Sequence, residues 1–478
     1  MELGWAVLFA GIVGLSSFWW ALGKVNYWYY EVMKLGDKKR LSLPPGDLGW
    51  PFIGNMWSFL RAFKSNNPDS FIASFASSPS IIVTTPEGCR RVLSDDEAFK
   101  PGWPSSTVEL IGRKSFIGIS FEDHKRLRKL TAAPVNGHDA LSFYITFIEE
   151  NVKIALEKWA SMGEIEFLTQ LRKLTFRIIM HIFLSSESEQ VREALENEYT
   201  TLNYGVRAMT INLPGFAYYN ALKARKRLVA IFQSVVDARR EKRRRNGIDI
   251  NEKHKDMMDR LMEVKDENGK QLDDEEIIDV LVMYLNAGHE SSGHVTMWAA
   301  LLLQKHPEVF KKAKAEQEEI VRNMPRDQKG LTLKEIRKME YLSNVVDETL
   351  RLVTFSQFVF REAKKDVNVS GYKIPEGWKV LAWFRGPHYD EEIYEDPFAF
   401  KPSRWDNFTP KAGTFLPFGA GSRLCPGNDL AKLEISIFLH YFLLGYELER
   451  KNPDCPLQYL PHTRPTDNCL GRIRKSVS

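Results

Sequence analysis

The sequence predicts a mainly α-helical protein with a small β portion, preceded by one N-terminal transmembrane helix. An uncharged run of twenty residues, 3–22, begins near the amino terminus. Helical periodicity dominates after residue 80, and its clearest example is a long apolar segment at 275–304. Short β signals occur at 80–85, at 366–383 and near the carboxyl terminus.

The composition narrows the class of protein. The 478 residues carry 66 basic and 62 acidic side chains, for a net charge of +4. This balance predicts a mixed, solvated surface and argues against a nucleic-acid-binding protein. The cysteines are Cys89, Cys425, Cys455 and Cys469, and no two form a C-x-x-C pair. We therefore expect neither a disulfide framework nor a zinc knuckle. The main fold is expected to lie in a reducing compartment.

Residues 1–23 are predicted to be a membrane anchor. At about 1.5 Å per residue, a helix over 3–22 would span roughly 30 Å, the thickness of a bilayer core. A cleaved signal peptide fits less well, because the start of the run lacks a positive charge and no A-x-A-like site follows. The basic stretch "KLGDKKR" at 34–40 predicts that the body of the protein is cytoplasmic.

Residues 24–55 are predicted to form a basic and proline-rich hinge. Its last part, "LPPGDLGWPFIGN" at 43–55, contains Pro44 and Pro45, which cannot continue a helix. We expect a stiff, non-helical connection that packs on the body through its apolar residues. No linker divides the remainder, so residues 56–478 are predicted to be one large domain.

Several elements of this domain can be placed from local signals. Residues 275–304 are apolar nearly all around, which predicts a central buried helix, and Asp273 and Asp274 suit its N-terminal end. Residues 306–324 predict an amphipathic surface helix. Residues 332–352 predict one or two further helices, with Thr332 as cap and Glu335 three residues later.

Two other segments have clear local signals. Residues 366–383 predict a β-hairpin whose turn is Pro-Glu-Gly at 375–377. The charge run "ARREKRRRNG" at 238–247 predicts a solvated helix end or loop.

The stretch "ETLR" places Glu348 and Arg351 on one helix face. Such a pair is usually a surface salt bridge worth under about 1 kcal/mol. Here apolar residues surround it, and a buried pair needs further partners to offset desolvation. Arg404, in "FKPSRW", is a candidate for this additional partner.

The stretch "AGHESSGH" at 287–294 puts polar side chains into the middle of the apolar helix. A small residue, Gly288, beside buried polar groups would leave room for a small ligand and a proton path. The alternatives are hydrogen-bonded core residues or a zinc site. His289 and His294 would point about 140° apart on a helix, which disfavours a shared metal ion.

The stretch "PFGAGSRLCPG" at 417–427 holds Cys425 in a loop of three glycines and two prolines. Backbone amides in such a loop can donate to a thiolate, and Arg423 adds a positive charge nearby. Asn428 and Asp429 are suited to cap the helix that follows. A rigid thiolate opposite a helix with polar groups in its middle suits an axial ligand of haem.

These motifs together resemble those of the cytochrome P450 monooxygenases. Phe418, Gly421, Arg423, Cys425 and Gly427 match the cysteine-ligand signature F-x-x-G-x-R-x-C-x-G. "ETLR", "FKPSRW", "AGHESS" and "LPPGDLGWPFIGN" match other motifs of that family in the same order. The resemblance covers essentially the whole chain and implies the cytochrome P450 fold.

The resemblance implies a role for each matching residue. Cys425 is the axial thiolate of haem b, in a loop that includes Phe418 and Gly421. Arg423, Arg361 and Arg128 are partners of the haem propionates, and His124 stands where many members have tryptophan. Glu348, Arg351 and Arg404 form a structural triad. Glu290 and Ser291 form the acid–alcohol pair of the proton relay, with serine in place of the usual threonine. The implied pocket-wall residues, for which ordinary core is an equal alternative, are Thr354, Phe355, Phe358 and Val359.

A narrower resemblance, carried by segments such as "REAKKDVNVSGYKIPEGWKVL" and "LPHTRPTDNCL", is to the ent-kaurenoic acid oxidases of plants. It implies oxidation of a diterpenoid acid toward gibberellins by ring B hydroxylation, ring contraction and oxidation to the acid. It also implies an endoplasmic reticulum membrane location and electrons from NADPH through a separate NADPH-cytochrome P450 reductase. The alternatives are a triterpenoid (beta-amyrin-type) oxidase of the same clan and a non-catalytic isoform.

The segment Ser70–Thr85 departs from these relatives. They carry an additional turn and strand before "PSIIV", and this chain lacks them. A lost strand would expose a sheet edge and part of the core. We therefore expect reduced stability or altered substrate access relative to a chain with the strand restored.

Overall fold

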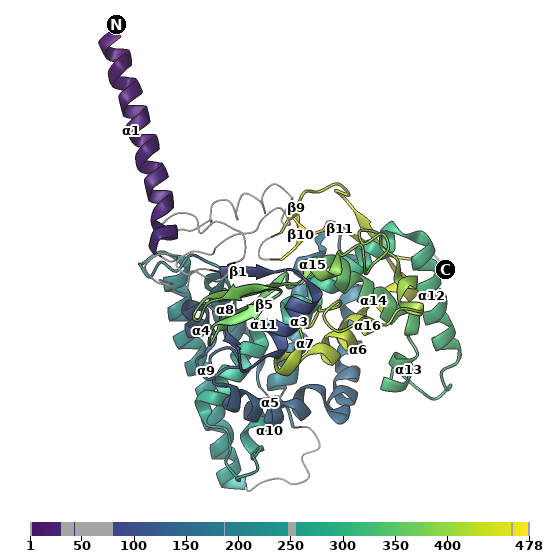
Figure 1. The fold of residues 1–478 in the computed structure, drawn as a ribbon. Coiled ribbons are helices and arrows are strands. Elements are labelled where there is room, and N and C mark those ends of the chain that lie inside the picture. Colours follow the sequence, from purple (N-terminus) through teal and green to yellow (C-terminus); the bar gives the residue numbers. More distant parts are fainter. Residues whose placement is uncertain are drawn as a thin grey trace.

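The computed structural model describes residues 2–29, 43, 80–185, 187–246, 255–459 and 462–476. Helices form most of these residues, and the short strands form separate small sheets at the edges of the helical body (Figure 1). The helices are α1 (Glu2–Tyr27), α3 (Pro86–Ser94), α4 (Ser105–Ile111), α5 (Phe121–Asn136), α6 (His138–Ser161), α7 (Phe167–Leu184), α8 (Glu189–Val206), α9 (Ala217–Asn246), α10 (Met257–Glu263), α11 (Asp274–Lys305), α12 (Pro307–Arg322), α13 (Leu333–Arg337), α14 (Glu340–Val353), α15 (Arg385–His388), α16 (Asn428–Gly445) and the 3-10 turns η4 (Pro402–Asp406) and η5 (Gly421–Arg423).

The largest sheet has the strand order β1-β7-β4-β2. Strand β1 runs parallel to β7, whereas β4 is antiparallel to both β7 and β2. A second sheet has the order β3-β11-β8, and β5-β6 and β9-β10 form two small ribbons. The strands are β1 (Ser80–Val83), β2 (Phe99–Pro101), β3 (Ile165–Glu166), β4 (Phe358–Ala363), β5 (Val367–Val369), β6 (Tyr372–Ile374), β7 (Lys379–Trp383), β8 (Tyr446–Arg450), β9 (Leu457–Gln458), β10 (Arg464–Pro465) and β11 (Leu470–Lys475).

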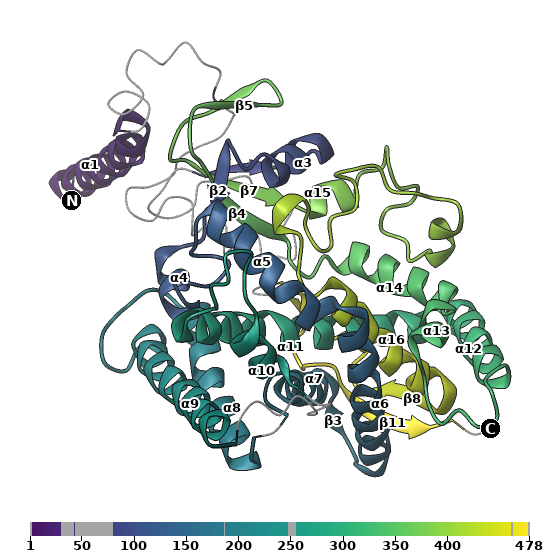
Figure 2. The ribbon, with the colours of Figure 1, turned by 90° about the horizontal axis from the view of Figure 1, so that it is seen from below.

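Helix α11 is the central element, as its all-round apolar pattern predicts. Asp273 caps it by accepting a hydrogen bond from the Glu276 amide, and the Asp273 amide donates to the Glu276 side chain. This capping box provides acceptors for two amides at the start of the helix. Figure 2 shows α11 in the middle of the helical body, with α8 and α9 to one side and α12, α13 and α14 to the other. Such a helix can present a few polar groups at fixed positions inside the core.

The amino-terminal helix α1 projects away from the body (Figure 1). It extends four residues beyond the predicted anchor boundary at residue 23, into the predicted hinge. Within the part of the chain that the structure describes, no helix combines the length and the apolar character that crossing a membrane requires. Apart from 24–29 and residue 43, the predicted hinge lies outside the described residues.

The predicted hairpin over 366–383 has a different turn. Strands β5 and β6 pair around Ser370 and Gly371, whose φ angles of 52° and 84° suit the tight turn of a two-residue hairpin. The turn at 375–377 instead leads out of β6 into β7, which belongs to the large sheet. The predicted turn was wrong because both turns carry a glycine, and β7 pairs with β1 and β4 instead of with β5.

Residues 238–246 of the predicted charge run form the end of α9, but they are not simply solvated. Arg239 is buried and donates to Asp256 and Glu187. Arg243 pairs with Asp259 at 2.9 Å. Acidic residues of α10 and its flanking turn therefore neutralise part of the run.

Strand β1 begins directly after the segment in which the resemblance to relatives predicts the loss of a strand. Its only partner among the described strands is β7, so β1 is an edge strand of the described sheet. Residues 70–79 lie outside the described residues, and the predicted loss of a strand stays a prediction there.

Candidate active site

The loop before α16 holds Cys425 through its own backbone. The Cys425 amide donates to the Phe418 carbonyl at 2.9 Å, and the Leu424 amide donates to the Gly421 carbonyl at 3.1 Å. Gly419 and Gly421 have φ angles of 75° and 72°, which other residues adopt only with strain. Helix α16 then starts at Asn428 with Gly427 as its cap residue. The predicted caps, Asn428 and Asp429, are instead the first two residues of the helix.

Replacing Gly421 by alanine is expected to destabilise this loop. Its Cβ would lie 2.5 Å from the Leu93 carbonyl oxygen, and the positive φ adds backbone strain of about 1–3 kcal/mol. We expect a lower melting temperature and a lower haem content per protein, measured by calorimetry and absorbance. Gly445→Ala is the matched control, because nothing lies within 4 Å of a Cβ there. Equal losses in both variants would contradict the prediction.

Four cationic or titratable side chains gather beside this loop from separate elements. Arg128 and His124 come from α5, Arg361 from β4, and Arg423 from the loop itself. Arg128 donates to the Leu424 carbonyl at 2.7 Å, and Arg423 donates to the Phe116 carbonyl at 2.9 Å. The structure thus brings the predicted propionate partners around one place, from positions hundreds of residues apart.

Protein carboxylates balance the charges of these arginines only from a distance, since Asp96 acts on Arg361 and Arg423 without forming an ion pair. No carboxylate in the described ranges lies within ion-pair distance of these three arginines. Burial, assisted by the three arginine charges, lowers the pKa of His124 to about 4. Burial and the charge of Arg423 lower the pKa of Arg361 to about 10. A group with carboxylates, such as haem with its two propionates, would fit this place.

The Cys425 side chain also requires a bound group to become a thiolate. Burial raises the pKa of its thiol, while the Gly427 amide and Arg128 oppose that shift. Coordination to a metal ion deprotonates a thiol outright. No cluster of three metal-ligating side chains exists in the described part of the chain. A metal ion that takes most of its ligands from a porphyrin, as haem iron does, fits a lone cysteine.

The predicted triad is assembled as expected. Arg351 donates to both oxygens of Glu348, at 3.0 and 2.9 Å, and Arg404 donates to Glu348 at 3.0 Å. Glu348 and Arg351 have fully buried side chains, and Arg404 is 10% exposed. The Trp405 indole adds a bond at 3.0 Å, so the buried carboxylate has the further partners that its desolvation demands.

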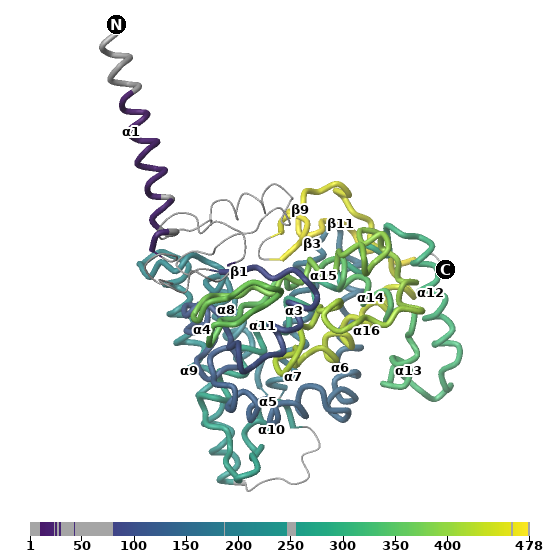
Figure 3. The backbone as a smooth tube through the Cα atoms, viewed as in Figure 1, coloured from purple at the N-terminus to yellow at the C-terminus, as the bar shows by residue number. Residues whose placement is uncertain are grey.

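His388 connects this triad to the cysteine loop, and sequence reasoning missed it. Arg351 donates to the His388 carbonyl at 2.8 Å, and the Leu416 amide donates to His388 Nε2 at 2.8 Å. Burial lowers the pKa of His388 to about 3, so the ring is neutral and its Nδ1 can donate to the Thr354 hydroxyl. Thr354 lies in this buried network. Figure 3 traces the backbone from α14 through α15 to α16.

Helix α11 directs Glu290 and Ser291 to different surroundings. Glu290 is buried and accepts hydrogen bonds from Arg172 and Arg207, and from Asn203 at 3.2 Å. The Ser291 hydroxyl donates to the Ala287 carbonyl at 2.9 Å. Although Glu290 and Ser291 are neighbours in the sequence, their side chains have different hydrogen-bond partners.

The two histidines of this stretch have separate partners. His289 Nδ1 lies 3.0 Å from the Leu285 carbonyl oxygen, and His294 Nδ1 lies 2.7 Å from that of Glu290. Burial lowers the pKa of both rings, to about 4 for His289. They are neutral, hydrogen-bonded core residues, which was one of the two alternatives to a ligand site.

The remaining predicted pocket residues are aromatic or aliphatic contacts. Phe355 stacks on His462 with ring centres 3.9 Å apart. Phe358 stacks on Trp383, and Val359 packs against the core of the large sheet. The His462 contact could not be foreseen, because residues 355 and 462 meet only through the fold.

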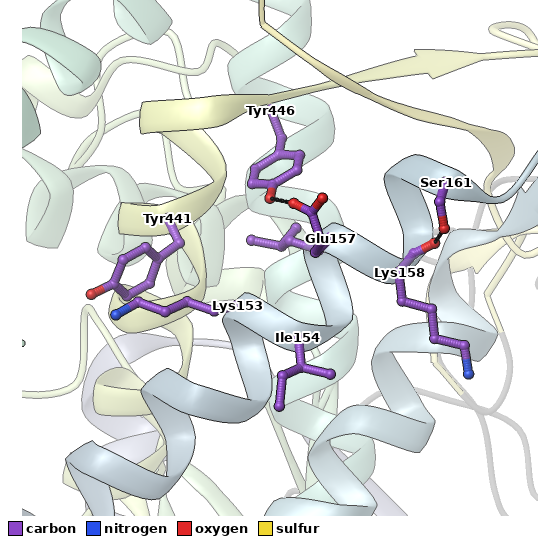
Figure 4. A pocket seen from close by; sticks show the side chains of 8 residues that line it. Lys153, Ile154, Glu157, Lys158, Ser161, Tyr441 and Tyr446 are labelled. Carbon is purple, nitrogen blue, oxygen red and sulfur yellow. Dashed lines mark hydrogen bonds between the residues drawn. The ribbon is translucent and has the colours of Figure 1, made fainter.

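A surface groove elsewhere is not the active site. It lies between α6 and the end of α16, with a volume of about 810 Å³, and none of the predicted site residues lines it. Figure 4 shows Glu157 accepting a bond from Tyr446, and Lys153 beside Tyr441. Charged residues of both signs form its walls, as on an ordinary protein surface.

Glu434 of α16 is buried in the core, and burial raises its pKa to about 8, with Ser292 opposing the shift. Below that pH the folded protein keeps the proton, whereas the unfolded chain loses it near pH 4.5. The free energy of unfolding should therefore fall as pH rises between these values, by up to about 1.4 kcal/mol per pH unit. Glu434→Gln should remove this slope in urea titrations at pH 6 to 8. An unchanged slope would contradict the raised pKa.

The chain is similar to known proteins of one family. Residues 44–466 match the cytochrome P450 family. Ent-kaurenoic acid oxidase 1 of Arabidopsis thaliana is 67% identical over 97% of this chain and 96% of its own. The 7,8-epoxymelianol synthase of Ailanthus altissima is 51% identical over 95% of this chain and 93% of its own.

A solved structure shares the fold. The retinoic acid-bound cyanobacterial CYP120A1 superposes with a TM-score of 0.80 at 27% identity, covering 91% of this chain and all of that one. The family match spans most of the chain, and the relative from Arabidopsis thaliana is 67% identical over nearly the full length of both chains. The chain therefore belongs to the cytochrome P450 family and is a haem-thiolate monooxygenase.

Proposed function

We propose that this monooxygenase oxidises ent-kaurenoic acid toward gibberellins, by ring B hydroxylation, ring contraction and oxidation to the acid. The observation that carries the proposal is the 67% identity to an ent-kaurenoic acid oxidase over nearly the full length of both chains. The proposal is also supported by the solved relative with the same fold, which is bound to retinoic acid, a carboxylic acid.

Cys425 would hold the haem iron, and Arg128, Arg361 and Arg423 would hold the propionates, with His124 beside them. Haem ligated by a cysteine thiolate favours O–O bond cleavage. Glu348, Arg351 and Arg404 keep the cysteine loop in place through His388. Ser291 would be the alcohol of the proton relay on α11, and Glu290 would be its acid. Phe355, Phe358 and Val359 would form part of the pocket wall.

The domain division and the membrane attachment belong to the same proposal. Residues 1–23 would anchor the chain in the endoplasmic reticulum membrane, 24–55 would be the hinge, and 56–478 would be the cytoplasmic catalytic domain. Ile12, Leu15, Phe18 and Trp20 of α1 are exposed, and such an apolar surface calls for a lipid or protein cover. NADPH would supply electrons through the separate reductase. Carbonate extraction of membranes should retain the full chain and release a chain without residues 1–23; release of both would contradict the anchor.

The function is tested by product analysis. The full chain, expressed with a plant reductase in yeast microsomes and given ent-kaurenoic acid and NADPH, should yield the ring-contracted acid and its intermediates. Turnover of beta-amyrin-type triterpenoids instead would support the alternative oxidase, in line with the synthase at 51% identity. A preparation without a haem band would support the non-catalytic isoform.

A further inference from the structure

A cluster of polar side chains surrounds Glu290 on the side of α11 that faces α7 and α8. It consists of Glu290, Arg172 on α7, Arg207 at the end of α8, and His462 and Arg464 near β10. Both arginines of the α7–α8 side donate to the Glu290 carboxylate, and His462 Nε2 lies 3.9 Å from it. We call these five residues the Glu290 cluster.

The Glu290 cluster carries more positive than negative charge. Its three guanidinium groups face one carboxylate, which leaves a surplus of two positive charges (three minus one). Burial holds the pKa of His462 well below its usual range, so the ring is neutral. Within the described residues, no carboxylate lies within ion-pair distance of Arg464, whose side chain reaches only the Gln458 amide oxygen at 3.5 Å.

Several donors of this region also lack a partner among the described residues. They are the Nε groups of Arg172 and Arg464 and the hydroxyls of Tyr199 and Thr463, all buried atoms. Leaving a buried donor unsatisfied costs about 1–3 kcal/mol, and more for a charged group. Burial and the charges of Arg172 and Arg464 lower the pKa of Arg207 to about 10, which shows that these cations repel one another. An anion would relieve both costs.

The Glu290 cluster lies beside the predicted substrate pocket and apart from the predicted site of the haem propionates. It adjoins Ser291 on α11, and His462 stacks on Phe355, a residue of the predicted pocket wall. The arginines at the propionate place are a different set, from α5, β4 and the cysteine loop. Two separate cationic places thus exist, and haem accounts for one.

We propose that the Glu290 cluster binds the carboxylate of the substrate, with Arg464 as its principal donor and Arg207 beside it. The inference rests on the proposed function, since it requires a substrate that is a terpenoid carboxylic acid. Guanidinium forks match a carboxylate with two parallel bonds, which fixes orientation as well as position. Glu290 holds Arg172 and Arg207 in place before the substrate arrives.

Spectral titration of the haem-loaded full chain tests the proposal. ent-Kaurenoic acid and its neutral methyl ester are titrated into the wild type, Arg464→Gln, Arg464→Lys and the control Arg474→Gln. The Arg474 side chain of β11 is exposed and pairs with Glu449 at the surface. Arg464→Gln should weaken binding of the acid about 10- to 100-fold, the loss of one charged hydrogen-bonding group. Its Kd for the ester should change less than twofold, and Arg464→Lys should lie between.

A structural role for Arg464 would give a different pattern. Replacing it would then lower the melting temperature and weaken acid and ester alike, whereas the proposal predicts an unchanged or higher melting temperature because a repelled cation is removed. Equal affinity of the wild type for acid and ester would overturn this inference but not the proposed function. Equal losses of affinity for acid and ester in Arg464→Gln would do the same. Failure of the wild type to bind either compound would contradict the proposed function and the inference with it.

Discussion

Replacing Cys425 by serine is expected to reduce monooxygenase turnover to background while the fold persists. The reduced, carbon monoxide-bound protein should lose the Soret band that marks thiolate ligation. The physical reason is that a serine hydroxyl is a far weaker acid than a thiol and does not ionise to serve as a strong anionic ligand, and thiolate donation is what favours O–O cleavage. The loop itself is held by backbone bonds from Cys425 to Phe418 and from Leu424 to Gly421, which the substitution leaves in place.

Cys455→Ser is the matched control, because Cys455 is a partly exposed free thiol near β9 that contacts Thr466. It should keep the thiolate band and full turnover. If Cys425→Ser retained that band, another residue would be the axial ligand, and the assignment of the loop would be wrong.

The sequence predicted those parts of the site that depend on local chemistry. Asp273 and Thr332 cap α11 and α13 with capping boxes, since each signal lies within four residues. The Glu348–Arg351 pair lies one helical turn apart, and its apolar neighbours indicated burial before the structure did. The cysteine loop was recognisable because glycine, proline and arginine occur at fixed spacing around one thiol.

The parts that the sequence did not predict depend on contacts between distant segments. Arg172 and Arg207 meet Glu290 from 118 and 83 residues away, and nothing in their local sequence distinguishes them from surface arginines. His388 gave no signal either, because its role arises from bonds to Thr354 and to Leu416. A pairing motif such as E-x-x-R can be found by spacing, whereas a polar cluster built by four elements requires the fold.

Replacing Arg351 by lysine is expected to lower the free energy of unfolding by about 3–5 kcal/mol, because two or more buried acceptors lose their donor at about 1–3 kcal/mol each. Arg351 donates to both Glu348 oxygens and to the carbonyls of His388 and Pro397, all within the core. A lysine ammonium is a point charge without the planar fork, so it cannot serve these acceptors at once. Urea unfolding followed by circular dichroism measures the loss.

Because Arg351 reaches the cysteine loop through His388 and Leu416, this variant should also lose haem more readily, without any change at a haem-contacting residue. Arg474→Lys is the control: its pair with Glu449 is exposed at 61% and 55%, and a surface pair contributes at most about 1 kcal/mol. If Arg351→Lys matched the control in stability but still lost haem, the triad would act on the loop alone. If it lost stability and kept haem at full occupancy, the path through His388 would not hold the loop. Only a loss of both agrees with a buried charge network that supports fold and cofactor together.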